Sequence, residues 1–522
     1  MDEHKGVPGW LAIVLFVVIT GLALVSMRRP QLALPRAAPA PAARLAPRPP
    51  LRAVQVWVST ADRRLQLARQ ADVAMQPRQA QPSDVVVDTR ATYQSIVGFG
   101  AAVTDASAWL LQNRMSPAQR DALLKELFGP PPGLAMNMTR LTIGASDFSP
   151  QPYTLDDMPA GETDPTLQHF NVTANLHDVI PTVREALAIN PTLRIIGSPW
   201  SAPAWMKTSD NLIGGELLES FESAYADYLV KYVDAYRSLG IPIFALTVQN
   251  EPGYSPATYP GMTMSAATRA RLIGDYLGPA LATRRRPTRI LAWDHNWDAP
   301  DQPLDVLADP QAERYVGGVA WHCYAGTPSA QSQVHRAYPS KDVYITECSG
   351  GDWESARKGE LMWFARDLLL AGIRHWARGV VYWNLALDEQ HGPHFGGCDL
   401  CKGVVTIDAQ TGAVTRNDEY YAFAHFSRFV LPGAIRVGSS ETDKDVNNVA
   451  FVNPGDGSVV LVVVNSRDQS SPVSVWQGQA GFAYTMPAQS VATFVWNPDP
   501  LGSWLRRALR WLDERRAASP HG

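Results

Sequence analysis

Short apolar runs alternate with longer stretches of helical spacing along most of this chain. Eight such runs occur, at residues 95–100, 138–144, 193–200, 243–252, 289–294, 316–324, 343–348 and 380–384. Each has the length and apolar character of a buried strand. Strand and helix alternating eight times predict an α/β fold of the (β/α)8 TIM-barrel type, in which the strands form an inner ring.

The stretches between these runs carry the signals of helices. In residues 219–239, aromatic and aliphatic side chains recur every three or four positions and form one apolar stripe that ends at Gly240. Ser116 before Pro117 is typical of a helix cap followed by a first-turn proline. Residues 360–373 supply a helix between the last two runs. These helices would surround the barrel.

Outside the barrel the pattern changes to short strands separated by turn residues. Two strands, 448–452 and 458–465, flank a turn rich in glycine and aspartate. Further strands are predicted after them, at 473–476 and 490–496, and before the barrel, at 54–59 and 84–87. We therefore expect a β-sandwich built from both ends of the chain, residues 53–92 and 433–498, around a catalytic barrel at 93–432.

The first 29 residues have the character of a transmembrane anchor. Gly9–Met27 is uncharged over 19 residues, close to the about 20 that a helix needs to cross a bilayer. Residues 30–52 are rich in proline and alanine and would form a disordered tether. An uncleaved anchor is favoured over a cleaved signal peptide, because Ala-x-Ala sites occur only deep in the tether.

The charges that flank the apolar segment bear on the orientation of the anchor. Arg28 and Arg29 follow the apolar segment, and taken alone they would place the catalytic domain in the cytoplasm. A long translocated domain can override so small a bias. We expect a membrane-anchored protein with an extracytoplasmic catalytic domain, the alternative being secretion after signal cleavage.

The end of the chain, residues 499–522, is basic and amphipathic. Its apolar residues at helical spacing are Trp504, Leu505, Ala508, Trp511 and Leu512. Such a helix could lie on an anionic membrane or pack on the sandwich. The sequence leaves both possibilities open.

Composition narrows the class of function. The net charge of −4 gives no reason to expect nucleic-acid binding. A hydrophobic share of 46% in 522 residues is ample for a barrel core and a second domain. Sixteen tryptophans could stack on sugar rings, although most tryptophans in proteins simply fill cores.

Two glutamates stand at the downstream ends of apolar runs, Glu251 in the fourth and Glu347 in the seventh. In a (β/α)8 barrel, chemistry lies at the C-terminal ends of the strands. Two carboxyl groups that face each other there can act as acid and nucleophile on a glycosidic bond. A single glutamate at a strand end is more often a surface or salt-bridged group, but the pair, with Asn250 beside one of them, indicates a glycosidase.

Several long segments resemble glycoside hydrolase family 30, and most closely its glucosylceramidase branch. They are Gln94–Ser107, Ser198–Thr208, Asn250–Pro252, Trp383–Leu387 and His425–Phe429, and they occur in the order of the family motifs. Long motifs in one order are far more specific than any one of them alone. The resemblance implies a (β/α)8 barrel with a fused β-sandwich, in agreement with the pattern above.

The same resemblance implies roles for individual residues. Glu251 would be the general acid/base, Glu347 the nucleophile, and Asn250 the group that hydrogen-bonds the sugar 2-hydroxyl. Burial without a neighbouring cation would raise the pKa of Glu251, so that it can carry a proton. No metal or organic cofactor is implied.

Further residues would surround these three. The resemblance places Asp105, Trp200 and Trp383 around the bound sugar, and it places Arg140, at the end of strand two, and Tyr324, at the end of strand six, where they hold the nucleophile ionised. Asp105 could instead cap the following helix, and the two tryptophans could be core residues.

The cysteines and histidines give no complete metal site. Cys398 and Cys401 are expected to form a local disulfide, because no second pair at suitable spacing would complete a metal site. Cys323 and Cys348 end adjacent strands and are expected as free thiols. His322 and His394 lack metal-ligand spacing. Cys323 and His394-Phe395 replace the Trp and the Asn-Trp of mammalian members, on the side of the leaving group.

Together these features predict retaining hydrolysis of a β-glucoside through a covalent glycosyl-enzyme. Glucosylceramide is the expected substrate, and a β-1,6-glucan or another β-glycoside is the alternative. A different class also fits the pattern: a membrane-tethered carbohydrate-binding protein on an inactive barrel. The intact glutamate pair, with Asn250 and Arg140, argues against that class.

Overall fold

The computed structural model describes residues 53–284, 287–353, 360–441 and 443–498. The predicted anchor, tether and C-terminal tail, residues 1–29, 30–52 and 499–522, lie outside these ranges. Among the described residues, no helix combines the length and the apolar character that crossing a membrane requires.

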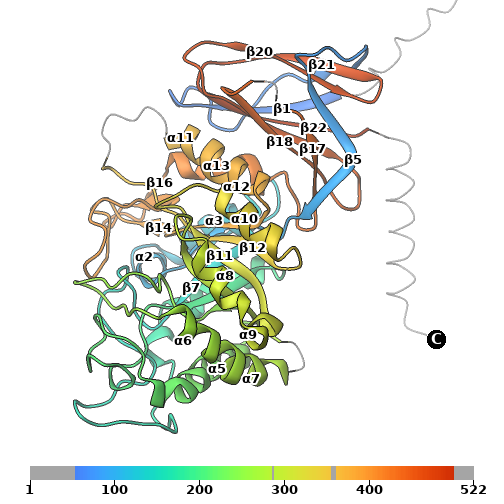
Figure 1. Cartoon of the computed structure of the whole chain (residues 1–522). Coiled ribbons are helices and arrows are strands. Elements are labelled where there is room, and N and C mark those ends of the chain that lie inside the picture. The colour runs from blue at the N-terminus through green and yellow to red at the C-terminus, as the bar shows by residue number, and fades with distance from the viewer. Residues whose placement is uncertain (1–52, 285–286, 354–359, 442, 499–522) are drawn as a thin grey trace, which may run out of the picture. The chain divides into compact units, whose positions relative to one another are not determined.

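Eight parallel strands close into a barrel, as predicted (Figure 1). The order around the ring is β6-β7-β8-β9-β10-β11-β12-β13, so strands that follow one another in the sequence lie side by side. The strands are β6 Gly98–Ala101, β7 Met138–Ile143, β8 Arg194–Pro199, β9 Ile243–Thr247, β10 Arg289–Asn296, β11 Val316–His322, β12 Asp342–Glu347 and β13 Ala377–Tyr382. Each falls within or overlaps one of the predicted apolar runs.

Helices connect these strands. They are α2 Asp105–Asn113, α3 Pro117–Phe128, α4 Val179–Ile189, α5 Glu222–Ser238, α6 Ala266–Arg271, α7 Gly278–Ala282, α8 Asp301–Ala308, α9 Pro310–Tyr315, α10 Ser329–Ala337, α11 Glu360–Trp363 and α12 Ala371–Arg374. A π-helical segment joins α6 to α7, and another joins α11 to α12. The predicted helix 360–373 is therefore present but widens to a π-helix in its middle.

Local sequence explains why these helices begin and pack as they do. Ser116 caps α3 with a capping box: its hydroxyl accepts from the Gln119 N–H, and the Gln119 side chain accepts from the Ser116 N–H. The stripe on α5 is buried, since Tyr225, Tyr232 and Tyr236 have no exposed surface. The predicted cap at Ser116 and the predicted apolar stripe on residues 219–239 are therefore confirmed.

The inside of the barrel is filled by side chains, so no channel runs through it. One buried layer consists of Met138, Ile196, Ala245, Leu291, Ala320, Tyr344 and Val381, one from each of seven strands. The polar residues described below therefore lie above an apolar floor. This floor confines polar chemistry to the C-terminal mouth of the barrel.

A second sheet combines both ends of the described chain. Its order is β2-β1-β22-β19-β18-β17-β5-β20-β21-β4, with β3 also paired to β1. The strands are β1 Ala53–Thr60, β2 Ala68–Arg69, β3 Val73–Ala74, β4 Gln76–Pro77, β5 Val85–Ser95, β17 Ile435–Ser439, β18 Val446–Val452, β19 Val459–Asn465, β20 Ser471–Gln477, β21 Ala480–Met486 and β22 Ser490–Trp496. The pairing of β1 with β22 confirms that strands from the two ends share one sheet.

The sheet folds around its own hydrophobic core, which makes it a sandwich. Valines of β1 and β19 meet Val475 of β20 and Phe482 of β21 there. β17 and β21 were not predicted, because their apolar residues are too few to stand out from the flanking turns. A short sheet of β14 Ala386–Leu387, β15 Val405–Ile407 and β16 Val414–Arg416 and a helix α13 Asp418–Ser427 follow the last barrel strand.

His425 of α13 joins this helix to the sandwich. Its Nδ1 lies 2.8 Å from the hydroxyl of Thr493 on β22, and its Nε2 lies 2.9 Å from the hydroxyl of Ser59 on β1. The imidazole is fully buried. Burial lowers its pKa from 6.5 to about 3, because no carboxylate compensates the charged form.

This histidine should make the fold acid-sensitive. The unfolded chain takes up a proton near pH 6.5, whereas the folded chain does so only near pH 3. Stability is therefore complete above pH 6.5 and declines by about 1.4 kcal/mol per pH unit below it. His425→Gln should be less stable at pH 7 but should show a flatter decline between pH 6.5 and 4 in chemical unfolding. An unchanged slope would show that His425 does not drive the acid response.

Candidate active site

Glu251 and Glu347 come to the C-terminal mouth of the barrel by different local routes. Glu347 is the last residue of β12, whereas Glu251 lies beyond β9, which ends at Thr247. Glu251 has a φ of 46°, a conformation that side chains other than glycine rarely adopt. Its backbone N–H donates to the carbonyl oxygen of Asp294 on the next strand, at 3.0 Å. Backbone contacts between neighbouring strands thus hold the strained residue.

Arg140 hydrogen-bonds to Glu347 and to Asn250, the residue before Glu251. It lies in the middle of β7, not at the strand end as predicted, and has no exposed surface. One guanidinium nitrogen donates to Glu347 at 2.5 Å, and the other donates to Asp294 at 2.8 Å and to Oδ1 of Asn250 at 2.7 Å. Two predicted site residues, Glu347 and Asn250, therefore meet at the predicted cation Arg140.

Asp294 on β10 was missed by the sequence reading. Besides Arg140, its carboxylate accepts from the hydroxyls of Ser198 at 2.6 Å, Thr247 at 2.7 Å and Thr346 at 2.6 Å. Burial opposes its ionisation, but Arg140 and these hydrogen bonds outweigh burial and hold the pKa well below its usual range. Asp294 is thus a permanent anion inside the barrel.

Glu251 is flanked by two imidazoles. Nδ1 of His322 lies 3.1 Å from Oε1 of Glu251, and Nδ1 of His295 lies 3.3 Å from the same oxygen. Burial would raise the pKa of Glu251, but the two histidines outweigh it and lower the pKa to about 2. The prediction that Glu251 is buried without a cation, with a raised pKa, is therefore wrong. The two strands that follow β9 in the ring, β10 and β11, bring His295 and His322 to it.

His322 holds the proton that Glu251 lacks. Its Nε2 lies 3.1 Å from Asp294, and Glu347 is 3.7 Å from its Nδ1. Burial lowers the pKa of an imidazole, but the charges of Glu347, Asp294 and Glu251 raise that of His322 to about 9. Glu251 and His322 therefore share one proton at neutral pH.

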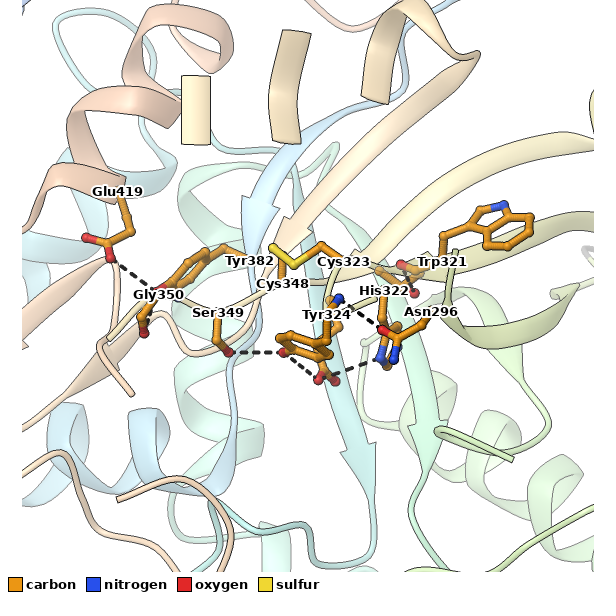
Figure 2. The surroundings of a disulfide bond; sticks show 12 residues. Asn296, Trp321, His322, Cys323, Tyr324, Cys348, Ser349, Gly350, Tyr382 and Glu419 are labelled. Carbon is orange, nitrogen blue, oxygen red and sulfur yellow. Dashed lines mark hydrogen bonds and ion pairs between the residues drawn. A yellow bond between two sulfur atoms is a disulfide. The ribbon is translucent and has the colours of Figure 1, made fainter. Parts of the chain in front are cut away.

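Tyr324 lies two residues beyond β11 and reaches Glu347 from the other side. Its hydroxyl donates to Oε1 of Glu347 at 2.9 Å and lies 3.1 Å from the hydroxyl of Ser349 (Figure 2). Glu347 is thus held by Arg140 at one oxygen and by Tyr324 at the other. This contact agrees with the predicted position of Tyr324 beside the nucleophile.

Trp200 and Trp383 stack on each other. Their ring centroids are 5.0 Å apart, and the guanidinium of Arg140 lies 4.8 Å from the centre of Trp200. They are only 3% and 2% exposed. The structure therefore places them beside the charged cluster as buried residues, and a direct contact with sugar stays a prediction.

Two aspartates complete the surroundings. Asp105 does not cap α2, because Thr104 does; its carboxylate accepts instead from Ser149 at 2.6 Å and Tyr153 at 3.0 Å. Asp147, which follows β7, lies close enough to the pair that burial and the charges of Glu347 and Glu251 raise its pKa to about 8.

The four cysteines form two disulfides. The disulfide between Cys398 and Cys401 is present, as predicted. Cys323 and Cys348 are also joined in a disulfide, with 5.3 Å between their Cα atoms, so the prediction of free thiols is wrong. The sequence showed that they end adjacent strands but not that their side chains point toward each other.

One group of side chains in the described ranges is close enough together to surround a metal ion, and it consists of Glu251, His295 and His322. Glu251 lies 3.1 Å from Nδ1 of His322 and 3.3 Å from Nδ1 of His295, and a carboxyl pair needs no metal to cleave a glycoside. His394 binds the carbonyl oxygen of Gly396 and takes no part in the group.

The geometry and the sequence together identify the family. The description "Glycosyl hydrolase family 30 TIM-barrel domain" matches residues 96–430, and "Glycosyl hydrolase family 30 beta sandwich domain" matches residues 433–494. The chain belongs to glycoside hydrolase family 30 and is a glycosidase of that family.

Individual relatives indicate where in the family it lies. An endo-1,6-beta-D-glucanase of Aspergillus fumigatus is 39% identical and covers 77% of this chain and 85% of its own length. The structure of "the endo-beta1,6-glucanase BT3312" is 32% identical, with a TM-score of 0.79, and covers 86% of this chain and 100% of that one. The lysosomal acid glucosylceramidase of Mus musculus is 30% identical, covering 77% and 81%. The predicted glucosylceramidase branch is therefore not confirmed, and the alternative is better supported.

The residues that sequence reasoning missed share a simple position. Asp147 follows β7, and Asp294 and His295 end β10. Polar residues at the C-terminal end of a barrel strand are candidates for the site by position alone. Their position at or shortly after the end of a barrel strand is the signal that marks all three.

His322 offers a direct test of the shared proton. His322→Gln should lower kcat about 100-fold on aryl β-glucosides with poor leaving groups, which need a proton. The alkaline limb of kcat/KM should move to lower pH, because the imidazole that retains a proton to about pH 9 is gone. The surface variant His169→Gln, whose side chain is 66% exposed, serves as the control. An unmoved alkaline limb would refute the shared proton.

Proposed function

We propose that this protein is a retaining β-glucosidase that cleaves β-1,6-linked glucan, with Glu347 as nucleophile and Glu251 as acid/base. The observation that carries the proposal is the arrangement of these two groups. Glu347 is bound by Arg140 and Tyr324, whereas Glu251 is bound by two imidazoles. Glu347 is therefore paired with a fixed cation, and Glu251 with His322, an imidazole that carries a mobile proton.

The spacing of the pair supports retention of configuration. Nδ1 of His322 lies 3.1 Å from Oε1 of Glu251 and 3.7 Å from Oε1 of Glu347, so these two oxygens are no more than about 7 Å apart. Retaining glycosidases separate the groups by about 5–5.5 Å and inverting ones by about 6.5–9.5 Å. This bound applies to the two facing oxygens and is compatible with the retaining separation.

The reaction would proceed in two steps. In the first, the Glu347 carboxylate forms a bond to the anomeric carbon, while the leaving oxygen departs with a proton from Glu251. In the second, Glu251 removes a proton from water, whose oxygen attacks the anomeric carbon and releases Glu347. His322 would pass its proton to Glu251 for the first step and take back the proton that Glu251 removes from water in the second, so that the cycle closes.

Asn250 is placed for the sugar 2-hydroxyl. Its carbonyl oxygen accepts from Arg140 at 2.7 Å, which orients the amide nitrogen away from the cation. An amide N–H so fixed can donate to a hydroxyl on the sugar and bind it more strongly in the transition state. Asp147 and Asp105 would accept from other hydroxyls, with Trp200 and Trp383 closing the apolar side of the sugar.

The choice of glucan over glucosylceramide rests on the relatives and on the leaving-group side. A pocket of about 470 Å³ adjoins His295, and its lining includes Glu216, Asp298 and Gln302. The lining also includes Pro252, Met264 and Trp293, so it is mixed. Its carboxyl and amide groups can pair with the hydroxyls of a further sugar, whereas the hydrocarbon of ceramide would leave them unpaired. The pocket therefore favours a carbohydrate leaving group.

The two disulfides support action outside the cytoplasm. Such bonds persist in oxidising compartments. We propose an exported enzyme, secreted or held at the membrane by the predicted anchor. Its partner would be a β-glucan, with no nucleic acid and no cofactor involved.

Mutations can separate the two roles. Glu347→Gln should abolish turnover of all substrates, because no covalent intermediate can form. Glu251→Ala should retain partial activity on an aryl β-glucoside whose leaving group needs no proton, and azide should rescue it with a β-glycosyl azide as product. Rescue of the Glu347 variant in its place would reverse the assignments, and a product first released as the α-anomer would exclude retention.

Substrate choice can be measured with a pocket variant. The wild-type protein should cleave β-1,6-glucan, and Asp298→Ala should lower kcat/KM on the glucan about tenfold, by loss of a hydrogen bond to the leaving sugar. Activity on an aryl β-glucoside, which does not fill the pocket, should stay within about twofold. Cleavage of glucosylceramide in vesicles without cleavage of the glucan would return the protein to the glucosylceramidase branch.

A further inference from the structure

The ends of β11 and β12 are irregular where the site is built. Trp321 pairs with Ile345, but the next pair is His322 with Glu347, so Thr346 is an extra residue on β12. The hydroxyl of Thr346 donates to Asp294 at 2.6 Å. A bulge of this kind re-aims side chains at the end of a strand. Here it brings Glu347 beside His322.

The Cys323–Cys348 disulfide lies immediately beyond that last pair (Figure 2). No strand pairing continues past it, because β11 ends at His322 and β12 at Glu347. Without the disulfide, neither a covalent bond nor strand pairing would join the segment after β11 to the segment after β12 at this point. The disulfide is thus the covalent link between the segment that carries Tyr324 and the segment that carries Glu347.

Tyr324 depends on its backbone for position. The residue is 45% exposed, and its ring meets the His322 ring edge-on, with 6.0 Å between their centroids. Its backbone N–H donates to Asn296 at 2.9 Å, and its hydroxyl reaches Glu347 and Ser349. A phenol that is packed on one side only keeps its orientation best if the chain next to it is fixed.

Cys348, unlike Tyr324, is fully buried. It has no exposed surface, and its carbonyl oxygen accepts from the backbone N–H of Trp383 at 2.9 Å. The disulfide therefore anchors the exposed Tyr324 segment to a rigid part of the barrel that also bears the nucleophile.

We propose that the Cys323–Cys348 disulfide is a positioning element of the catalytic reaction, which holds the Tyr324 hydroxyl on Glu347. The inference rests on the proposed role of Glu347 as nucleophile. The disulfide touches no substrate and acts through Tyr324. A disulfide that only stabilised the fold would lower the unfolding temperature and leave the function of Tyr324 unchanged.

A double-mutant cycle on kcat separates these two roles. The variants are Cys323→Ser/Cys348→Ser, Tyr324→Phe and their combination, assayed on an aryl β-glucoside well below the unfolding temperature. Tyr324→Phe should lower kcat about 10- to 100-fold, the effect of one hydrogen bond to a charged group. The disulfide variant should lower kcat similarly with little change in KM. The combined variant should be no slower than Tyr324→Phe alone.

The second disulfide supplies the matched control. Cys398→Ser/Cys401→Ser removes a disulfide that packs with Trp200 and Trp383, reaches Gly351 through Cys401, and covalently links neither the Tyr324 segment nor the Glu347 segment. Its effect on kcat should multiply with that of Tyr324→Phe. Multiplication of the Cys323/Cys348 effect with Tyr324→Phe, or an unchanged kcat in that disulfide variant, would overturn the proposal.

Reduction provides a test that needs no folding of a cysteine variant at the site. In the Cys398→Ser/Cys401→Ser background, a phosphine cleaves the Cys323–Cys348 bond to two thiols and is oxidised to its oxide with oxygen from water. Reduction should lower kcat in this background but not when Tyr324→Phe is also present. Equal losses in both would overturn the proposal. An unmodified protein inactive on aryl β-glucoside and β-1,6-glucan would instead refute the proposed function.

Discussion

The buried guanidinium of Arg140 is the interaction on which the site depends. It has no exposed surface and sits above an apolar floor, so its charge must be neutralised by protein groups. Asp294 and Glu347 supply that neutralisation at 2.8 and 2.5 Å. Removing either partner would leave an unpaired charge in the interior, which costs several kcal/mol. The position of Glu347 is therefore a requirement of folding as well as of chemistry.

The same network couples the two glutamates. Asp294 binds Arg140 with one oxygen and His322 with the other, and His322 in turn binds Glu251. A fixed anion thus connects Arg140, the cation beside Glu347, to His322, the imidazole beside Glu251. Because the interior is shielded from water, a change in charge at any member is felt by the others. This coupling is how two carboxyl groups in one mouth acquire opposite tasks.

Around this rigid centre, the segments beyond the strands are held by separate means. Tyr324 lies outside regular structure and reaches Glu347 from an exposed position. The pocket beside His295 is lined by residues from several connecting segments. Barrels commonly keep the reacting groups on strands and place selectivity on loops. In this chain the charged groups of the barrel mouth are held by buried contacts, whereas the pocket beside His295 is lined mostly by residues of the connecting segments.

Sequence alone determined the eight-stranded barrel, the sandwich from both ends, and the pair of glutamates, because periodicity and strand-end position are local properties. It also identified Arg140 and Tyr324 through motifs. Tertiary structure alone decided the tuning of the site. Asp294, His295 and His322 reach Glu251 and Arg140 only when β10 and β11 close the ring, and Cys323 meets Cys348 only through a bulge in their pairing. A pKa depends on charges a few ångströms away in space, and no local pattern records which distant residues those will be.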